Sequence, residues 1–186
     1  MHLSTEKQNL MEVEYVILVT KDDKPLGTME KMEAHEKAVL HRAFSVFIFN
    51  SKGELMLQQR ALHKYHSPGL WTNTVCSHPR AGEDTSAAAH RRMREEMGFD
   101  CDIEETFSFV YKADVGQGLK EHEYDHVFMG TCNKEPVPNP DEVADWKYVD
   151  LDFVTKDIKE HPELYTEWFK IALNQVVRHF KQKSVR

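Results

Sequence analysis

One helix-forming segment in the middle of the chain, with strand-forming segments on either side, constrains the possible folds most strongly. Residues 86–97 are rich in alanine and arginine, and Gly98 follows them as a residue that commonly ends helices. Earlier in the chain, apolar runs at 43–49 and 54–59 flank the turn-forming residues 50–53, which predicts a β-hairpin. This order of elements does not fit a regular series of strand–helix–strand units.

The remaining segments extend the same pattern of strands around a central helix. Strand-like runs occupy residues 13–19, 106–113, 124–132 and 146–149, and an amphipathic segment at about 163–180 predicts a C-terminal helix. Turns or loops are expected at 21–27, 116–118 and 136–140, where glycine or proline recurs. We therefore expect one domain over residues 1–186, in the α/β (α+β) class, with its core at about 13–150.

The overall charge limits the classes of partner. The chain has 24 Lys and Arg residues against 31 Asp and Glu residues, which gives a formal net charge of −7. Nucleic acids and anionic membranes both favour a basic surface, so neither is expected as a general partner. A small anionic molecule remains compatible with the sequence where lysine and arginine side chains gather locally.

Cysteine usage and the N-terminus indicate the compartment. Cys76, Cys101 and Cys132 are odd in number and widely spaced, so neither a disulfide framework nor a CxxC zinc site is expected. The first seven residues lack the apolar run of a signal peptide. No apolar stretch approaches the roughly 20 residues that a membrane-spanning helix needs. We expect a soluble, cytoplasmic protein with free thiols.

The central helix carries a dense set of charges. Arg91, Arg92, Glu95 and Glu96 lie within one short segment, and Glu83 precedes them in the loop before the helix. This spacing resembles the Nudix box, in which carboxylates on a loop–helix–loop hold a divalent cation against a diphosphate. A solvated charged helix shows similar runs, so the segment alone supports both interpretations equally.

The match to the Nudix box departs at two positions. Ser77 stands where the pattern has its first glycine, and Arg92 stands where it has a glutamate. The loss of that carboxylate weakens the metal cluster that hydrolysis requires, and it places a positive charge there instead.

Three other strings are more specific than the helix. Residues 71–79 read Trp-Thr-Asn-Thr-Val-Cys-Ser-His-Pro, residues 35–45 read His-Glu-Lys-Ala-Val-Leu-His-Arg-Ala-Phe-Ser, and residues 121–123 read Glu-His-Glu. Together they closely resemble the type I isopentenyl-diphosphate isomerases, and the resemblance extends from about residue 13 to 150. It implies a Nudix-like α/β/α sandwich with a mixed β-sheet. It also implies an isomerase of isoprenoid biosynthesis that interconverts isopentenyl and dimethylallyl diphosphate.

Moving a double bond by a 1,3-proton shift through a tertiary carbocation needs one group that adds a proton and another that removes one. The resemblance assigns these roles to Cys76 and Glu123, with the phenol of Tyr111 hydrogen-bonded to Glu123. Glu123 is the favoured donor to the alkene, although both groups must exchange roles in the reverse reaction. An isolated cysteine is more often a packing residue, and an isolated tyrosine is often a half-buried strand residue.

The resemblance also implies two cation sites. Three histidines and two glutamates would form the first, and this mixed set suits Mn²⁺ or Zn²⁺ better than Mg²⁺. Its members are His35, His41, His78, Glu121 and Glu123. The second would hold Mg²⁺ between the diphosphate, Glu96 and the main-chain carbonyl of Cys76. The other eight histidines, His66 and His122 among them, are expected to be structural or exposed, with His122 on the opposite face of its strand.

For the diphosphate itself, the matching cations are Lys31, Arg60, Lys64 and Arg92. Trp168 resembles the indole that covers the pocket and faces the carbocation. Taken singly, each cation could equally be a solvated surface residue, and Trp168 could be a core residue.

Two other functions remain open from the sequence. The first is a Nudix hydrolase of a diphosphate, against which Arg92 and the Cys76–His78 string argue. The second is a non-catalytic metal-binding or ligand-binding module that has kept the fold. The substrate expected for the isomerase is a small allylic or homoallylic diphosphate, and the sequence indicates no protein partner.

Overall fold

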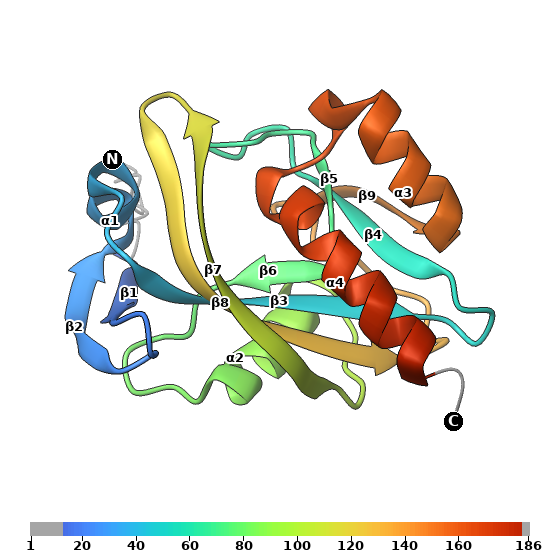
Figure 1. The fold of residues 1–186 in the computed structure, drawn as a ribbon, viewed down its shortest axis with the longest axis horizontal. Helices are drawn as coiled ribbons and strands as arrows, with labels where there is room; N and C mark the ends of the chain where they lie inside the picture. Colours follow the sequence, from blue (N-terminus) through green and yellow to red (C-terminus); the bar gives the residue numbers. More distant parts are fainter. Residues whose placement is uncertain (1–12, 184–186) are drawn as a thin grey trace, which may run out of the picture.

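Nine strands, all within the described residues 13–183, pair into one mixed sheet in the computed structural model (Figure 1). The strands are β1 (Tyr15–Val19), β2 (Pro25–Glu30), β3 (His41–Phe49), β4 (Leu55–Arg60), β5 (Trp71–Thr72), β6 (Val75–Ser77), β7 (Glu104–Gly116), β8 (Leu119–Thr131) and β9 (Val143–Val149). The helices are α1 (Lys31–Lys37), α2 (Thr85–Arg92), the π-helical turn η1 (Met93–Met97), α3 (Leu151–Glu160), the 3₁₀ turn η2 (Pro162–Leu164) and α4 (Glu167–Lys183). The segment for which no signal peptide is expected lies outside the described residues.

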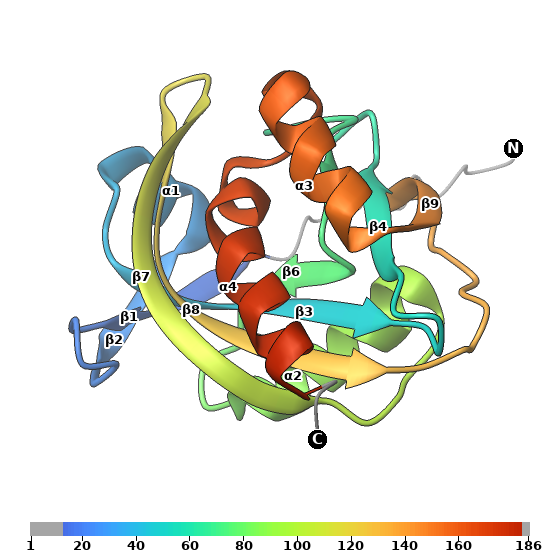
Figure 2. The same cartoon turned by 45° about the vertical axis from the view of Figure 1, so that its right-hand side comes forward.

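β3 is the centre of this sheet. It pairs in parallel with β8 along its whole length, from His41 opposite Glu123 to Phe49 opposite Thr131. It pairs antiparallel with β6 and continues through the predicted hairpin into β4. β7 and β8 form a long antiparallel hairpin that curves away from the rest of the sheet (Figure 2). The one parallel pair makes the sheet mixed, as predicted.

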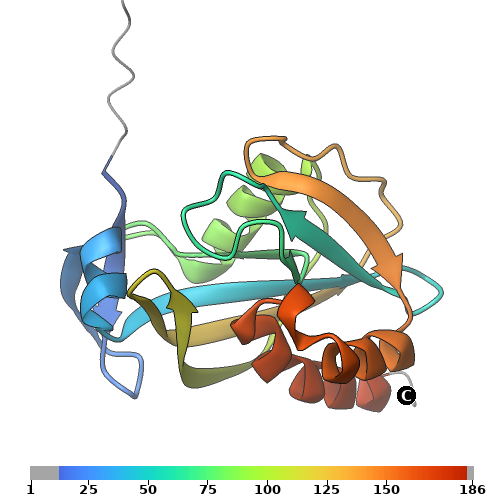
Figure 3. The same cartoon turned by 90° about the horizontal axis from the view of Figure 1, so that it is seen from above.

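Helices cover both faces of the sheet. Alternate side chains of β3 point to opposite faces, so Phe44 and Val46 pack beneath α2, whereas Phe47 and Phe49 pack with α3 and α4. Figure 3 shows α2 on one side of the strands and α3 with α4 on the other. This arrangement confirms the predicted α/β/α sandwich.

The central helix has well-defined ends. The carboxylate of Asp84 caps its start by accepting a hydrogen bond from the backbone N–H of Ala87. Gly98 ends the segment with φ 70°, and a Cβ there would lie 2.3 Å from the carbonyl oxygen of Val137. Glycine is therefore required. The predicted helix at 86–97 is confirmed, except that its last turn is a π-helix.

The C-terminal region differs from the prediction. A single helix was expected at about 163–180, but α3 precedes it and α4 begins only at Glu167. The carboxylate of Asp150 caps α3, and Pro162 opens the 3₁₀ turn η2. Tyr165 then forms an isolated bridge with Trp71, which holds the chain extended just before α4.

Short elements near the N-terminus were also not predicted. β2 begins at Pro25, inside the expected turn, because it pairs with β1. α1 follows it directly, and the carboxylate of Glu30 caps its first turn. The two short strands β5 and β6 lie within a polar segment that has no strand-like alternation. Among residues 13–183, no helix is both long and apolar enough to cross a membrane.

Candidate active site

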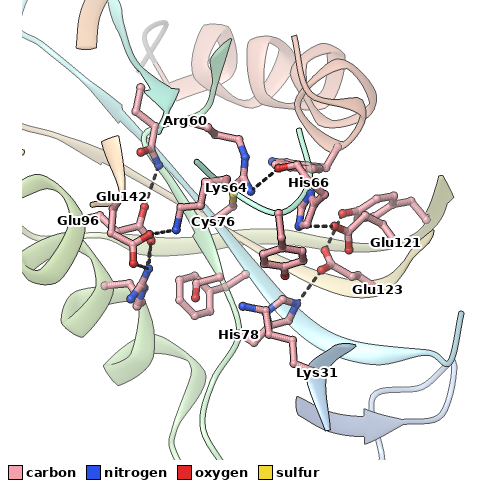
Figure 4. Close-up of a pocket in the computed structure, with 17 residues that line it drawn as sticks. Lys31, Arg60, Lys64, His66, Cys76, His78, Glu96, Glu121, Glu123 and Glu142 are labelled. Carbon is pink, nitrogen blue, oxygen red and sulfur yellow. Dashed lines mark hydrogen bonds and ion pairs between the residues drawn. The ribbon is translucent and has the colours of Figure 1, made fainter. Parts of the chain in front are cut away.

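A pocket beside β3 contains or adjoins every side chain predicted for the site (Figure 4). Its lining includes Lys31, Arg60, Lys64, Cys76, His78, Arg92, Glu96, Tyr111, Glu121, Glu123 and Trp168. His35 and His41 are fully buried behind it, next to His78. Residues that are widely separated in the sequence are thus gathered at one place.

Strand register explains this gathering. The β3–β8 pairing sets His41 opposite Glu123, and the β7–β8 pairing sets Tyr111 opposite the same glutamate. β6 brings Cys76 to the other edge of β3, opposite Ser45. Cys76 and Glu123 therefore come from strands that flank β3 on its two sides.

We call the group His35, His41, His78, Glu121 and Glu123 the imidazole end of the pocket. The Nε2 atom of His78 lies 2.9 Å from Oε1 of Glu123 and 3.2 Å from Nε2 of His41. One donor atom each from His35, His41, His78 and Glu123 can be chosen so that all lie within 4.8 Å of one another. This spacing is close to that of ligands around a single ion.

The tautomers of two histidines favour a cation there. Nδ1 of His35 donates to the carbonyl of Lys31 at 2.6 Å, and Nδ1 of His41 donates to the carbonyl of Val39 at 2.8 Å. A ring that is neutral in this tautomer presents an Nε2 lone pair to the cluster, which is the form that binds metals, whereas a protonated ring donates from Nε2 to the carboxylates. Within the described residues, His35 Nε2 and Glu121 Oε2 are also buried without a hydrogen-bond partner. Two orphaned atoms that face each other fit an ion-binding site.

The two carboxylates of the imidazole end have opposite electrostatic surroundings. Burial and the nearby charge of Glu123 raise the pKa of Glu121 above its ordinary value. Burial would also raise the pKa of Glu123, but its contacts with His41 and His78 hold it well below the usual range. Burial lowers the pKa of His78 to about 4. The carboxylate of Glu123 is therefore ionised and the ring of His78 neutral near pH 7.

The proton-handling candidates Cys76, Tyr111 and Glu123 all line the pocket, and Glu123 also belongs to its imidazole end. Burial raises the pKa of the Cys76 thiol, so the sulfur carries its proton at neutral pH. The phenol of Tyr111 donates a hydrogen bond to Oε2 of Glu123 at 2.6 Å, and burial likewise raises its pKa. A protonated thiol and an oriented carboxylate thus line one pocket.

We call the group Lys64, Arg92, Glu96 and Glu142 the ion-pair end. Nη2 of Arg92 lies 2.8 Å from Oε1 of Glu96 and 3.3 Å from Oε1 of Glu142. Lys64 forms an ion pair with the other oxygen of Glu142. Gln58 donates to Oε2 of Glu96 at 2.9 Å. Both predicted phosphate-binding cations here are already paired with carboxylates.

The other residues predicted to bind the substrate also contact neighbouring groups of the protein. Arg60 donates to the carbonyls of His66 and Ser67, and its guanidinium lies 5.4 Å from the ring of Trp168. Lys31 forms a 2.6 Å ion pair with Glu14. Trp168 is buried, and its indole N–H has no hydrogen-bond partner among the described residues.

Glu142 and His66 are among the pocket residues that the sequence analysis missed. Glu142 lies in the loop after the prolines, where no periodic pattern marks it. Its carbonyl accepts from the N–H of Ala61, which ties this loop to the segment that carries Lys64. His66 was expected to be structural or exposed, but it is only 6% exposed and lines the pocket beside Glu121. Its nearness to Lys64 in the sequence was the available signal.

Other expectations about side chains agree with the structure. His122 points away from the pocket, where Nδ1 donates to the carbonyl of Ala38 at 2.8 Å. Cys132 is part of the core beneath α2, and Cys101 packs against it. All three cysteines are free.

Two solved structures have a similar fold. A crystal structure from Deinococcus radiodurans superposes with a TM-score of 0.73 at 18% identity, covering 87% of this chain and 98% of that one. A MutT protein from Methanosarcina mazei superposes with a TM-score of 0.60 at 16% identity, covering 79% and 96%. At such identities the likeness concerns the fold alone.

Sequence comparisons are closer. The family model described as NUDIX domain matches residues 39–169. Isopentenyl-diphosphate Delta-isomerase 2 of Aromatoleum aromaticum is 53% identical over 87% of this chain and 86% of its own length. The protein of the same name from Photorhabdus laumondii is also 53% identical, over 87% and 91%. Since this identity extends over the strands and the helix that build the pocket, the chain belongs to the isopentenyl-diphosphate Delta-isomerase family, on a NUDIX fold.

Proposed function

We propose that this protein interconverts isopentenyl diphosphate and dimethylallyl diphosphate by a 1,3-proton shift through a tertiary carbocation, within isoprenoid biosynthesis. The observation that carries the proposal is the placement of Cys76 and Glu123 in one pocket, on strands that flank β3 from opposite sides. The reaction transfers protons between carbon and these two groups and leaves the diphosphate intact. The identity of the relatives named above supports the same reaction.

In this proposal Glu123 adds a proton to the terminal alkene carbon, and Cys76 accepts the proton that leaves on the other face. The pocket favours the opposite starting states, a protonated thiol and an ionised carboxylate, so the reaction in this direction first requires Cys76 to lose a proton and Glu123 to gain one. Tyr111 holds the carboxyl group in place through its 2.6 Å hydrogen bond. After the reaction Cys76 carries a proton and Glu123 does not, so in the reverse reaction Cys76 is the donor and Glu123 the acceptor. The ring of Trp168 would stabilise the positive charge on the tertiary carbon.

We propose that the imidazole end holds Mn²⁺ or Zn²⁺. A divalent cation there would neutralise the paired carboxylates Glu121 and Glu123 and fix their positions. At the other end, Glu96 and the carbonyl of Cys76 would hold Mg²⁺ against the diphosphate. Each carboxylate oxygen has two lone pairs, so Glu96 can ligate an ion while it keeps its bonds to Arg92 and Gln58.

Arg92, Lys64, Arg60 and Lys31 are the proposed ligands of the diphosphate. Arg92 and Lys64 are balanced by Glu96 and Glu142, so the ion-pair end as it stands offers little net positive charge. A diphosphate would therefore enter together with a divalent cation. We also propose that residues 1–186 form one domain, and the expected cytoplasmic location remains a prediction.

The test is to incubate the purified protein with isopentenyl diphosphate and Mg²⁺ in deuterated water, with and without a chelator. We expect deuterium in the methyl group formed from the former alkene carbon, with no phosphate released, and we expect the chelator to stop the reaction. Phosphate released at the rate of substrate loss, without isomer, would make the protein a hydrolase. Metal binding with no product of either kind would make it a non-catalytic module.

A further inference from the structure

We propose that His66 is a positioning residue that orients Glu121 toward the metal at the imidazole end. The proposal rests on the metal centre proposed above and adds a residue outside its five ligands. The chemistry is a hydrogen bond from the imidazole Nε2–H to Oε1 of Glu121, which leaves Oε2 free for the ion. Such outer partners of ligating carboxylates set both their orientation and the affinity of the site.

The geometry separates the two oxygens of Glu121. Oε2 lies 3.1 Å from Nε2 of His35, and Oε1 lies 3.6 Å from Nε2 of His66. Two ligands at right angles around one ion, with bonds of about 2.1 Å, lie about 3 Å apart, which matches the first distance. The second distance is longer than a hydrogen bond, and a small rotation of the carboxylate would shorten it. Donor atoms of His35, His66 and Glu121 form a group within 4.8 Å.

His66 itself is placed to act as the donor and not as a sixth ligand. Neither His66 nor Glu121 belongs to the compact group of His35, His41, His78 and Glu123, whose donor atoms all lie within 4.8 Å. Oε2 of Glu121 lies 3.1 Å from Nε2 of His35, a member of that group, whereas Nε2 of His66 faces the other oxygen of Glu121 at 3.6 Å. Nδ1 of His66 is 3.4 Å from the hydroxyl oxygen of Ser67, a group that can donate to it. A ring that accepts at Nδ1 carries its proton at Nε2, on the side of Glu121.

The surroundings of His66 keep its ring in this orientation. Its centroid lies 4.5 Å from that of Tyr65 and 6.0 Å from that of Trp168, both in edge-on arrangements. Arg60 donates to its carbonyl at 3.1 Å and to the carbonyl of Ser67 at 3.2 Å. The backbone that carries His66 is therefore held by Arg60, a residue proposed to bind the diphosphate.

The test measures Mn²⁺ affinity with no substrate present, by EPR of the free ion. His66→Phe keeps an aromatic ring of similar size but has no donor, whereas His66→Gln keeps an N–H donor. We expect His66→Phe to weaken Mn²⁺ binding by about 10- to 100-fold, the usual effect of removing an outer partner. We expect His66→Gln to recover most of that affinity. His63→Phe, at an exposed position in the same loop, is the matched control and should bind as the wild type does.

Co²⁺ absorption separates this role from direct ligation. Because a positioning residue contributes no nitrogen to the ion, His66→Gln should keep the wild-type spectrum. A changed spectrum in that variant, or equal Mn²⁺ affinity in the wild type and His66→Phe, would overturn the role of His66 while the metal centre stands. A wild-type protein that takes up no Mn²⁺ would instead overturn the metal centre and this role together. Circular dichroism of the metal-free variants identifies any that fail to fold.

Discussion

The two ends of the pocket are both polar and partly buried, yet they are built in opposite ways. At the ion-pair end, every cation already has a carboxylate partner, as in the pairing of Arg92 with Glu96 and Glu142. At the imidazole end, ring nitrogens and carboxylate oxygens face one another, and within the described part of the chain His35 Nε2 and Glu121 Oε2 have no hydrogen-bond partner. In the first arrangement the charged side chains already have partners, whereas the second leaves two buried polar atoms that the proposed cation would satisfy. The contrast predicts which substitutions remove catalysis, which remove metal and which only weaken substrate binding.

The largest effect should come from Cys76, which lines the pocket and belongs to neither end. Cys76→Ala removes a proposed proton carrier, so we expect turnover to fall by about 10²- to 10⁴-fold, the usual range for general acid–base groups. Metal content and folding should be unchanged. The measurement is isomer formation by NMR, with Cys132→Ala as the control that loses packing but keeps activity. Near wild-type turnover in Cys76→Ala would exclude the thiol as a proton carrier.

The second largest effect should come from substitutions that remove histidines from the imidazole end. The double variant His35→Ala with His78→Ala removes two of the proposed ligands, so we expect it to lose its tightly bound Mn²⁺ or Zn²⁺ in elemental analysis. Activity should fall with the metal and should not return at ordinary Mn²⁺ concentrations. His122→Ala, which changes a histidine that faces away from the pocket, is the control. Unchanged metal content in the double variant would show that the ion is bound elsewhere.

A smaller effect is expected at the ion-pair end. Arg92→Gln removes the charged hydrogen bond proposed to hold the diphosphate, which corresponds to about a 10-fold or greater rise in KM. The value of kcat should change much less, because the diphosphate is an anchor in both the ground state and the transition state. Arg94→Gln, on the exposed side of the same helical segment, should leave both constants unchanged. A fall in kcat at constant KM would give Arg92 a part in the chemistry itself.

The smallest effect should be a change in the pH dependence of the free energy of unfolding when Glu142 is replaced. Burial would raise the pKa of Glu142, but Arg92 and Lys64 hold it below its ordinary value. A carboxyl group whose pKa is lowered by folding stabilises the protein above its unfolded pKa of about 4.3, and this contribution disappears as the pH falls through the folded value. We expect Glu142→Gln to be less stable by roughly 1 kcal/mol at pH 7, and nearly as stable as the wild type near pH 3. Urea unfolding at both pH values measures this difference, and a difference independent of pH would contradict the ion-pair explanation.

Local patterns explain how much of the fold could be predicted. Two elements were predicted from signals that lie close together in the sequence. These are the hairpin between β3 and β4, marked by its turn residues, and the helix that ends at Gly98, marked by its composition and its final glycine. β6 has only three residues, and β5 has two, so neither could show an alternation. These short strands form because β3 and β4 provide edges for them, and that information is not local.

The candidate site was predicted where motifs were dense. Cys76 and His78 lie in one distinctive string, and Glu121 and Glu123 lie in another, so the resemblance located them together. His66 and Glu142 lie on irregular loops, and their side chains reach the pocket only through contacts made after folding. The ion pairs that occupy Lys64 and Arg92 also depend on that tertiary arrangement, so the closed state of the ion-pair end could not be predicted from the sequence.

The parallel pairing of β3 with β8 also has a consequence for the time course of synthesis on the ribosome. Ser45 and Asp125, which share a buried hydrogen bond across this pair, are 80 positions apart in the chain. β3 is buried along nearly its whole length in the folded protein. Because β8 comes much later in the chain, the apolar side chains of β3 leave the ribosome long before the strand that pairs with one of its edges. Pairings of such sequence separation form slowly, and the nascent chain is prone to aggregation until they are complete. Glu121 and Glu123 are synthesised about 80 positions after His35 and His41, so the proposed ion could bind only after most of the chain has been made.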